Sequence, residues 1–198
     1  LENYYKEFVR GGALLDKKEK RLLLDINTQL GLESIKFGSN LLADSKEFQM
    51  IITNEKELSG LPESVRQSAK EAAKEANVEG WLFTLDKPSC IPFLQYADNR
   101  SLREKIYKAY YNRGNNPNQY NNVSTIRQIL KLRQQKATML GFDTYADFKM
   151  DVKMAKTPEA ATKLMEAIWE AAIKRAKQEA AELQKMIDSE GGNFKKRL

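Results

Sequence analysis

Residues 157–190 read TPEAATKLMEAIWEAAIKRAKQEAAELQKMIDSE, and this stretch sets the fold class of the chain. Thr157 and Pro158 are favoured at the start of a helix, and Gly191 is typical of a helix end. An apolar stripe recurs between them at helical spacing, through Ala161, Leu164, Ile168, Ala172, Ala176, Leu183 and Ile187. The pattern predicts one helix of roughly 50 Å, whose alanines let neighbouring helices approach closely.

A second long helix is predicted upstream. It begins at Asp16, because Glu19 three residues later completes the pattern of a capping box. Gly31 and Gly38 lie inside the helix, and each costs about 1 kcal/mol relative to alanine. We therefore expect a kink or a close helix contact there. The helix carries an apolar stripe through Leu22, Ile26, Leu30, Phe37 and Leu41.

Shorter elements fill the rest of the chain. The runs at 48–53 (FQMIIT) and 80–85 (GWLFTL) are β-prone and predict an antiparallel ribbon. The sequence thus predicts a mainly α protein, a multi-helix bundle-like array with one small two-stranded β-ribbon, in a single helical region over 1–198. The other helices are expected at 1–10, after Asn54, from Pro62 to about Ala76, near 91–97, at 100–113, at 124–140 and after Asp143.

The charge pattern argues against a nucleic-acid partner. The chain has 33 basic and 27 acidic residues, but the two signs are interleaved. The one compact basic cluster, Lys195 to Arg197, follows a Gly191-Gly192 break and is interpreted as a linker or cut end. A nucleic-acid-binding domain needs one basic face, so it stays the weaker alternative.

Cysteine use and hydropathy indicate the compartment. Cys90 is the single cysteine, expected to be a buried inert thiol, and fits a reducing compartment. No apolar run approaches the roughly 18–20 residues that cross a bilayer, and no signal-peptide pattern opens the chain. We expect a cytoplasmic protein without a membrane partner. Because the chain starts at Leu1 and not at Met, a periplasmic location after removal of a leader stays open.

The sequence contains no histidine. Histidine is the usual general base and the commonest zinc ligand, so neither a Ser-His-Asp triad nor a Cys-His pair can be assembled within the chain. We therefore predict no catalytic residue and no metal ligand here, and we assign no substrate-binding residue.

Three constellations suggest a site but have simpler structural interpretations. Asp143, Asp147 and Asp151 share a helix face at i, i+4 and i+8, yet Asp143 is expected to cap the helix and Asp147 to lie in its first turn. The aromatic side chains are expected to pack, with Trp81 on the ribbon and Trp169 in a helix seam. The aromatic cluster of the helix at 100–113 comprises Tyr107, Tyr110 and Tyr111.

Four arginines have the donor geometry to bind a substrate carboxylate through their guanidinium groups. Glu104, one turn from Arg100, is the simpler partner, in an exposed pair worth about 0.3–0.5 kcal/mol. The four are Arg100, Arg103, Arg113 and Arg133.

The stretch 88–114, PSCIPFLQYADNRSLREKIYKAYYNRG, resembles the thimet oligopeptidase family of zinc metallopeptidases, in particular its peptidyl-dipeptidase branch. In that family a Pro-rich turn leads into an Asn-Arg-x-Leu-Arg-Glu helix that stops at Asn-Arg-Gly. Further blocks match in order, so that the resemblance covers nearly the whole chain: Arg10 to Ala13, Glu57 to Pro62, Leu140 to Phe142, Tyr145 to Phe148 and Met154 to Glu159.

The resemblance implies a parent zinc peptidase whose helical domains flank a deep channel. In this family a His-Glu-x-x-His helix and a downstream glutamate hold the zinc, and none of these matches a residue of this chain. The implied role is that of a non-catalytic fragment upstream of the zinc site, forming part of the channel wall. Its implied partners are short peptide substrates and the catalytic domain of the same polypeptide, which is expected to release C-terminal dipeptides. A stand-alone helical protein-interaction module is the alternative.

Overall fold

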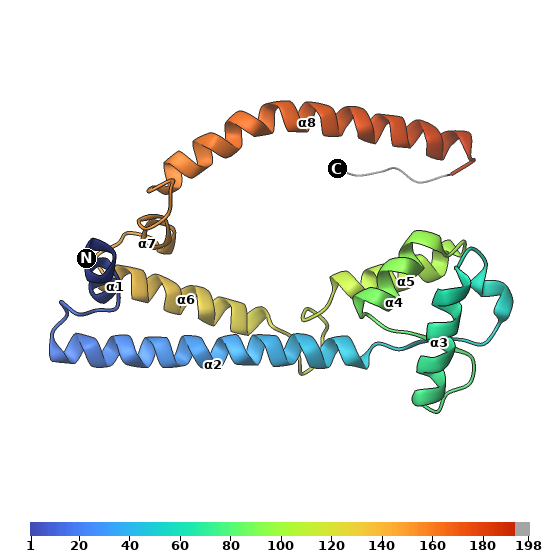
Figure 1. Cartoon of the computed structure of the whole chain (residues 1–198), viewed down its shortest axis with the longest axis horizontal. Helices are drawn as coiled ribbons and strands as arrows, with labels where there is room; N and C mark the ends of the chain where they lie inside the picture. Colours follow the sequence, from blue (N-terminus) through green and yellow to red (C-terminus); the bar gives the residue numbers. More distant parts are fainter. Residues whose placement is uncertain (193–198) are drawn as a thin grey trace. The chain divides into compact units, whose positions relative to one another are not determined.

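The computed structural model describes residues 1–192, and the basic cluster at 195–197 lies outside them. Two compact units make up the chain (Figure 1). One unit consists of residues 1–14 together with the chain from Gln134 onward, and the other covers Leu15–Arg133. Within residues 1–192, no helix combines the length and the apolarity needed to cross a membrane.

The unit Leu15–Arg133 begins with the long helix α2 (Lys17–Glu47). The predicted capping box is confirmed: Glu19 N–H donates to the Asp16 carboxylate over 2.8 Å, and Asp16 N–H donates to Glu19 over 3.0 Å. The prediction of a kink or close contact at the two glycines is wrong. A Cβ added at Gly31 or Gly38 meets no atom within 4 Å, and α2 runs unbroken past both (Figure 1).

The β-ribbon is confirmed, with strands shorter than the predicted runs. Strand β1 (Met50–Ile52) pairs antiparallel with β2 (Trp81–Phe83), with Ile51 opposite Leu82. The connection holds a 3-10 turn (Glu55–Leu58) and α3 (Glu63–Glu75). Gly80 (φ +101°) joins α3 to β2, where a Cβ would lie 2.2 Å from the Ile52 carbonyl oxygen.

Two further helices complete the core of this unit. α4 spans Lys87–Tyr96 and α5 spans Arg100–Tyr111. α4 begins earlier than predicted, because Pro88 lies in the first turn, where a helix needs no N–H donor. Phe83 of β2 meets Phe93 of α4 edge to face at 4.6 Å. The core comprises Met50, Ile52, Leu58, Leu61, Ala69, Phe83, Leu85, Cys90, Phe93, Ala97 and Ile106.

Helix α6 (Val123–Met139) lies alongside α2 (Figure 1). Phe37 of α2 and Ile126 and Ile129 of α6 line one groove of about 260 Å³. The apolar stripe predicted for α2 thus finds part of its cover in α6.

The other unit contains α1 (Glu2–Arg10), α7 (Tyr145–Met150) and α8 (Pro158–Ser189). Arg10 joins α1 to α7, since its guanidinium donates to the Phe148 carbonyl over 2.6 Å and to Asp151 over 2.9 Å. The same guanidinium lies 4.1 Å from the centroid of the Phe148 ring. All 32 residues of α8 lie in the described part of the chain, and none of them is buried.

Candidate functional site

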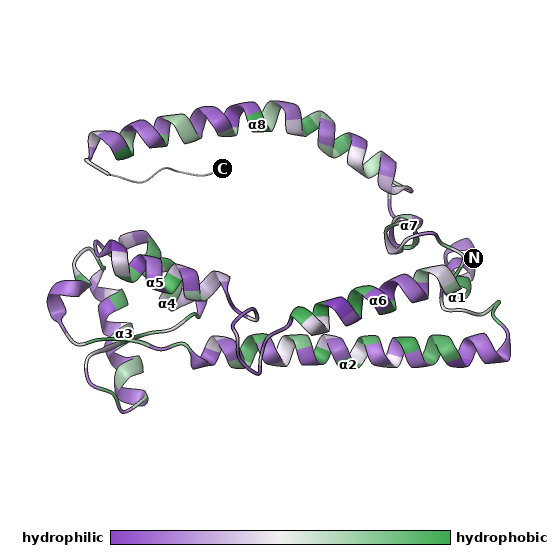
Figure 2. Cartoon of the chain, turned by 180° about the vertical axis from the view of Figure 1, so that it is seen from behind, coloured by the Kyte–Doolittle hydropathy of each residue, from purple (hydrophilic) through white to green (hydrophobic). Residues whose placement is uncertain are grey.

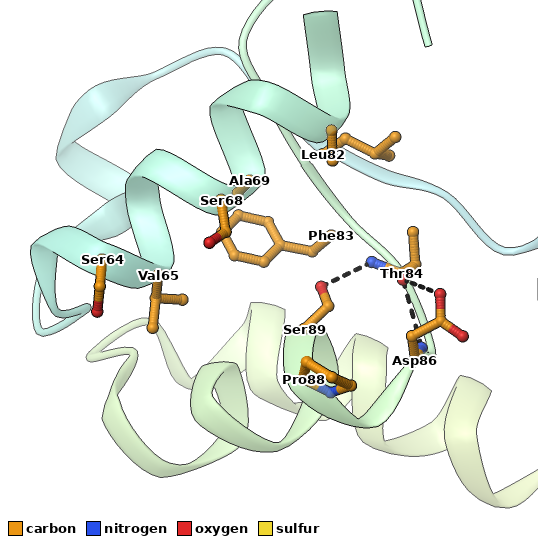
Figure 3. A pocket seen from close by; sticks show the side chains of 11 residues that line it. Ser64, Val65, Ser68, Ala69, Leu82, Phe83, Thr84, Asp86, Pro88 and Ser89 are labelled. Atoms are coloured by element: carbon orange, nitrogen blue, oxygen red, sulfur yellow. Dashed lines mark hydrogen bonds between the residues drawn. The ribbon is translucent and has the colours of Figure 1, made fainter. Parts of the chain in front are cut away.

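A cavity of about 420 Å³ opens between α3, β2 and the first turn of α4 (Figure 3). The apolar side of its lining includes Val65 and Ala69 of α3 and Phe83 of β2. Its polar side is formed by hydroxyl groups and one carboxylate, from Ser64, Ser68, Thr84, Asp86 and Ser89.

The polar groups at the mouth of this cavity largely bond one another. The backbone N–H of Thr84 donates to the Ser89 hydroxyl over 3.0 Å, and the Thr84 hydroxyl donates to the Asp86 carboxylate over 3.1 Å (Figure 3). These bonds shape the turn from β2 into α4. Because the Thr84 hydroxyl and the Asp86 carboxylate bond each other within the turn, the arrangement fits binding by shape.

The described residues do not provide a metal centre. Within residues 1–192, no three side chains of His, Cys, Asp or Glu gather closely enough to hold a metal ion. The zinc implied by the sequence resemblance therefore does not fit the donors present in this part of the chain.

The aspartates at i, i+4 and i+8 do not form one site, because Asp147 and Asp151 bond different partners. Thr144, and not Asp143 as predicted, caps α7, because its hydroxyl accepts from Asp147 N–H over 3.1 Å. The Asp147 carboxylate in turn accepts from Thr144 N–H over 3.0 Å, which completes a capping box. Asp151 pairs with Arg10 at 2.9 Å.

A second groove, of about 390 Å³, follows α4 and α5. The rings of Tyr107 and Tyr111 stack at 4.4 Å and are both exposed, so the prediction that these aromatics pack inward holds for Tyr110 alone. Leu94 and the stems of charged residues line the groove together with Tyr107: Arg100, Arg103, Glu104 and Lys108.

The charged groups of this groove already have partners. Arg103 donates to the carbonyl oxygens of Ala97 and Asp98, which ties α5 to the turn before it. Glu104 pairs with Lys108 at 2.5 Å, one turn further along α5, whereas the predicted partner Arg100 lies one turn away in the other direction. The hydrogen bond from Lys108 lowers the pKa of Glu104, and the charge of Arg100 adds to this effect.

Two other candidate arginines also lie against aromatic rings or apolar side chains. The guanidinium of Arg113 lies 3.7 Å from the Tyr110 ring centroid, and its Nε donates to the Tyr110 carbonyl over 2.7 Å. Arg133 lines the groove between α2 and α6.

The tryptophans and the cysteine divide into core and surface. Trp81 packs against the core and receives Lys70 at 4.7 Å over its ring, as expected for a side chain covering the ribbon. Trp169 of α8 is mostly exposed, so the expected helix seam is absent in the described residues. Cys90 is buried as predicted, and burial raises the pKa of its thiol although the charge of Arg113 acts the other way.

Sequence reasoning missed a polar cluster built around Asp44. This residue lies in α2, is 4% exposed, and accepts from Gly114 N–H over 2.6 Å. Asn116 and Asn118 donate their side-chain amides to the same carboxylate over 2.9 and 2.6 Å. Its signal in the sequence was a charged residue placed three positions after Leu41 on the apolar stripe.

The cluster holds the Asn-rich loop between α5 and α6 against α2. Asn122 extends it, since its side chain accepts from Asn40 and donates to the Phe37 carbonyl, both over 3.0 Å. Burial alone raises the pKa of Asp44, but the hydrogen bonds from Asn118, Gly114 and Asn116 outweigh it and hold the pKa below its ordinary value.

Comparison with known proteins assigns the chain to a family. A sequence model of peptidase family M3 matches residues 93–198, more than half of the chain. Oligopeptidase A of Haemophilus influenzae is 33% identical over 196 residues, which cover 97% of this chain and 29% of that protein. The organellar oligopeptidase A of Arabidopsis thaliana is 39% identical over 183 residues, 87% of this chain and 23% of that protein.

Dipeptidyl carboxypeptidase of Escherichia coli is similar as well, at 34% identity over 195 residues, 98% of this chain and 29% of that protein. The chain thus spans less than a third of the length of these relatives. Because the family model covers α5 to α8 and part of α4, the chain belongs to peptidase family M3.

Proposed function

We propose that this chain is a non-catalytic helical part of a zinc-dependent oligopeptidase that releases C-terminal dipeptides from short peptides. The observation that carries the proposal is the combination of two facts. The chain belongs to a peptidase family, and it contains no histidine. Peptide-bond hydrolysis in the complete protein is therefore assigned to residues outside these 198.

The relatives support the kind of peptidase. Proteins named oligopeptidase A and dipeptidyl carboxypeptidase both match nearly the whole chain at similar identity. The first name describes cleavage of short peptides and the second the removal of dipeptides from a C-terminus. The peptidyl-dipeptidase assignment rests on the Tyr-Asn-Arg-Gly-Asn-Asn sequence at 111–116.

The state of the reactive side chains supports a non-catalytic role. Asp44, Asp147 and Asp151 hold structural hydrogen bonds or ion pairs. The Cys90 thiol is buried with a raised pKa, which disfavours the thiolate needed for nucleophilic attack. The helices can still contribute through their shape. We assign to them one wall of a channel that admits short, extended peptides.

A peptide-hydrolysis assay tests the proposal. The complete polypeptide to which these residues belong is incubated with zinc and an unstructured oligopeptide, and the products are identified by mass spectrometry. We expect stepwise loss of C-terminal dipeptides, suppression by a chelator, and no turnover by the 198-residue chain alone.

A matched substrate sharpens this assay. Amidation removes the charge of the peptide C-terminus without changing its sequence. A peptidyl-dipeptidase that recognises the free carboxylate therefore loses activity on the amidated peptide. Equal cleavage of both peptides at internal bonds would favour an oligopeptidase over a peptidyl-dipeptidase. Zinc-dependent turnover by the 198-residue chain itself would refute the non-catalytic role.

We also propose a cytoplasmic location, because the single buried thiol at Cys90 fits a reducing compartment. The alternative is the periplasm, after removal of a leader. Fractionation of cells that express the complete polypeptide distinguishes the two.

A further inference from the structure

We propose that the seam between α2 and α6 binds one internal water molecule, which bridges the carboxylate of Glu33 and the hydroxyl of Thr125. Two buried oxygen atoms carry the proposal. Glu33 Oε2 on α2 and Thr125 Oγ1 on α6 are shielded from solvent, and neither has a hydrogen-bond partner among residues 1–192. Both residues belong to the unit Leu15–Arg133, so the site needs no contact with the other unit.

Buried polar atoms without a partner are rare in folded proteins. Thr125 keeps only 1% of its surface accessible, so bulk solvent does not reach its hydroxyl. A buried donor or acceptor that makes no hydrogen bond bears the full cost of leaving water, and the cost is higher for a charged group. The great majority of such groups therefore bond to protein or to an ordered water molecule.

Glu33 stands at one end of a polar line on α2. Glu33, Asn40 and Asp44 follow one another at i, i+7 and i+11, which places them on one face of the helix. Asp44 accepts from three donors of the Asn-rich loop, and Asn40 donates to Asn122 over 3.0 Å. Figure 2 shows such hydrophilic positions between the hydrophobic ones along α2. In the described chain, protein groups satisfy this line at Asn40 and Asp44 but leave Glu33 Oε2 without a donor.

The two oxygen atoms belong to the same level of the seam. Asn122 fixes the register of the helices, because its side-chain amide donates to the Phe37 carbonyl over 3.0 Å. From there α6 runs back along α2 toward its start (Figure 1). Thr125 lies one turn beyond Asn122, about 4.5 Å along the axis, and Glu33 lies one turn before Phe37, about 6 Å in the same direction. Helical geometry thus brings the carboxylate and the hydroxyl to one place.

The chemistry of the two groups selects water as the occupant. An ionised carboxylate only accepts hydrogen bonds, whereas a hydroxyl both donates and accepts. A water molecule that donates to Glu33 and accepts from the Thr125 hydroxyl satisfies both, and internal waters typically make about two to four such bonds. A divalent cation fits less well, because calcium and magnesium take about six or more oxygen ligands. In the part of the chain that the structure describes, no three acidic, histidine or cysteine side chains gather to hold one.

Oxygen-17 relaxation dispersion of the solvent tests the site, because it counts water molecules that remain bound for longer than the protein takes to tumble. Thr125→Val removes the hydroxyl with little change of shape. We expect the dispersion amplitude of the 198-residue chain to fall by the contribution of one water molecule in this variant. Thr125→Ser keeps the hydroxyl and is expected to keep that contribution.

Thr28→Val is the matched control. Its exposed hydroxyl on α2 bonds the Leu24 carbonyl over 2.9 Å, so its removal is expected to leave the dispersion amplitude unchanged. Glu33→Met gives the same test from the other helix, since it replaces the carboxylate by an apolar group of similar length. This variant is also expected to lose the contribution of one water molecule.

A double-mutant cycle measures the bridge independently. Each single variant, Thr125→Val or Glu33→Met, leaves one polar group of the bridge behind, while the double variant removes both. We therefore expect the unfolding equilibrium constant of the double variant to lie at least about twofold below the value that the two single effects predict when multiplied.

The proposal would be overturned by an unchanged dispersion amplitude in Thr125→Val or Glu33→Met, or by single effects that simply multiply in the cycle. A monovalent cation in place of water is the remaining outcome. It would show as a shift of the unfolding midpoint when sodium is replaced by the bulky tetramethylammonium ion, present in the unmodified chain and absent in Thr125→Val. That result would also overturn the assignment to water.

Discussion

Asp44 ties together residues that lie far apart in the sequence. A single carboxylate on α2 accepts hydrogen bonds from Gly114, Asn116 and Asn118, which lie 70 to 74 residues later in the sequence. A buried charge is stable only when donors surround it. Asp44 thus couples the position of the Asn-rich loop to the register of α2.

Asp44→Asn tests this coupling. The depressed pKa means that Asp44 stabilises the fold above its ordinary value of 3.8, and that this contribution is lost as pH falls through the lower pKa of the folded state. Near neutral pH we expect Asp44→Asn to lower the free energy of unfolding by about 1.5–3 kcal/mol. Urea titrations followed by circular dichroism, repeated down to about pH 3, measure both effects.

The exposed Asp25 on the same helix supplies the control, since Asp25→Asn is expected to change stability by less than about 0.5 kcal/mol. The role given to the cluster would be contradicted if Asp44→Asn had the stability of the unmodified protein at neutral pH and lost stability in acid to the same extent.

Two glycines offer opposite outcomes for one chemical change. Gly60 has φ +84°, and a Cβ there would lie 2.1 Å from the Tyr96 carbonyl oxygen. Gly60→Ala is therefore expected to cost at least about 2 kcal/mol. At Gly38, open space and helical backbone predict a gain of up to about 1 kcal/mol for Gly38→Ala. Thermal unfolding of the two variants should shift in opposite directions, and shifts of the same sign would disprove the argument.

Single residues were the least predictable part of the site. The capping box at Asp16 could be read from spacing, because its two partners lie three residues apart. The partner of Glu104 could not, because Arg100 and Lys108 are both one turn away and sequence does not rank them. The same ambiguity made Asp143 look like the cap that Thr144 provides.

At the scale of elements, local patterns determined most of the fold. Strong start and stop residues fixed α8 to within a residue, and the two β-prone runs paired as expected. α4 was harder to place, because Pro88 and Pro92 both lie inside it and a proline usually marks a boundary. Which element packs on the apolar face of each helix was also unpredictable, since it depends on contacts between residues distant in sequence.

The link between α1 and α7 depends on one side chain. Arg10→Gln removes the ion pair to Asp151, the bond to the Phe148 carbonyl and the cation over the Phe148 ring. We expect a loss of about 1.5–3 kcal/mol in the free energy of unfolding. Hydrogen exchange should show faster exchange of the amides of α1 and α7.

Lys6→Gln is the control for this variant on the same helix. Lys6 pairs with Glu2 on the exposed surface at 2.6 Å, where solvent screens the interaction. If Arg10→Gln and Lys6→Gln leave exchange in α1 and α7 equally unchanged, Arg10 does not anchor α1.

At the scale of the whole molecule, family membership and the fold class followed from the sequence, while a binding site did not. The motif at 88–114 carried the family resemblance, and the family model over residues 93–198 confirms it. The grooves formed by α3, α4 and α5 have polar groups that mostly satisfy one another.

The burial of Cys90 gives this protein an internal clock. This thiol of α4 is buried in the core, so an alkylating reagent reaches it only when that region opens. At low reagent concentration the modification rate reports the equilibrium population of the open state. At high reagent concentration it reports the rate constant of opening. Each of the variants above can be timed by the same native sulfur atom, without adding a probe.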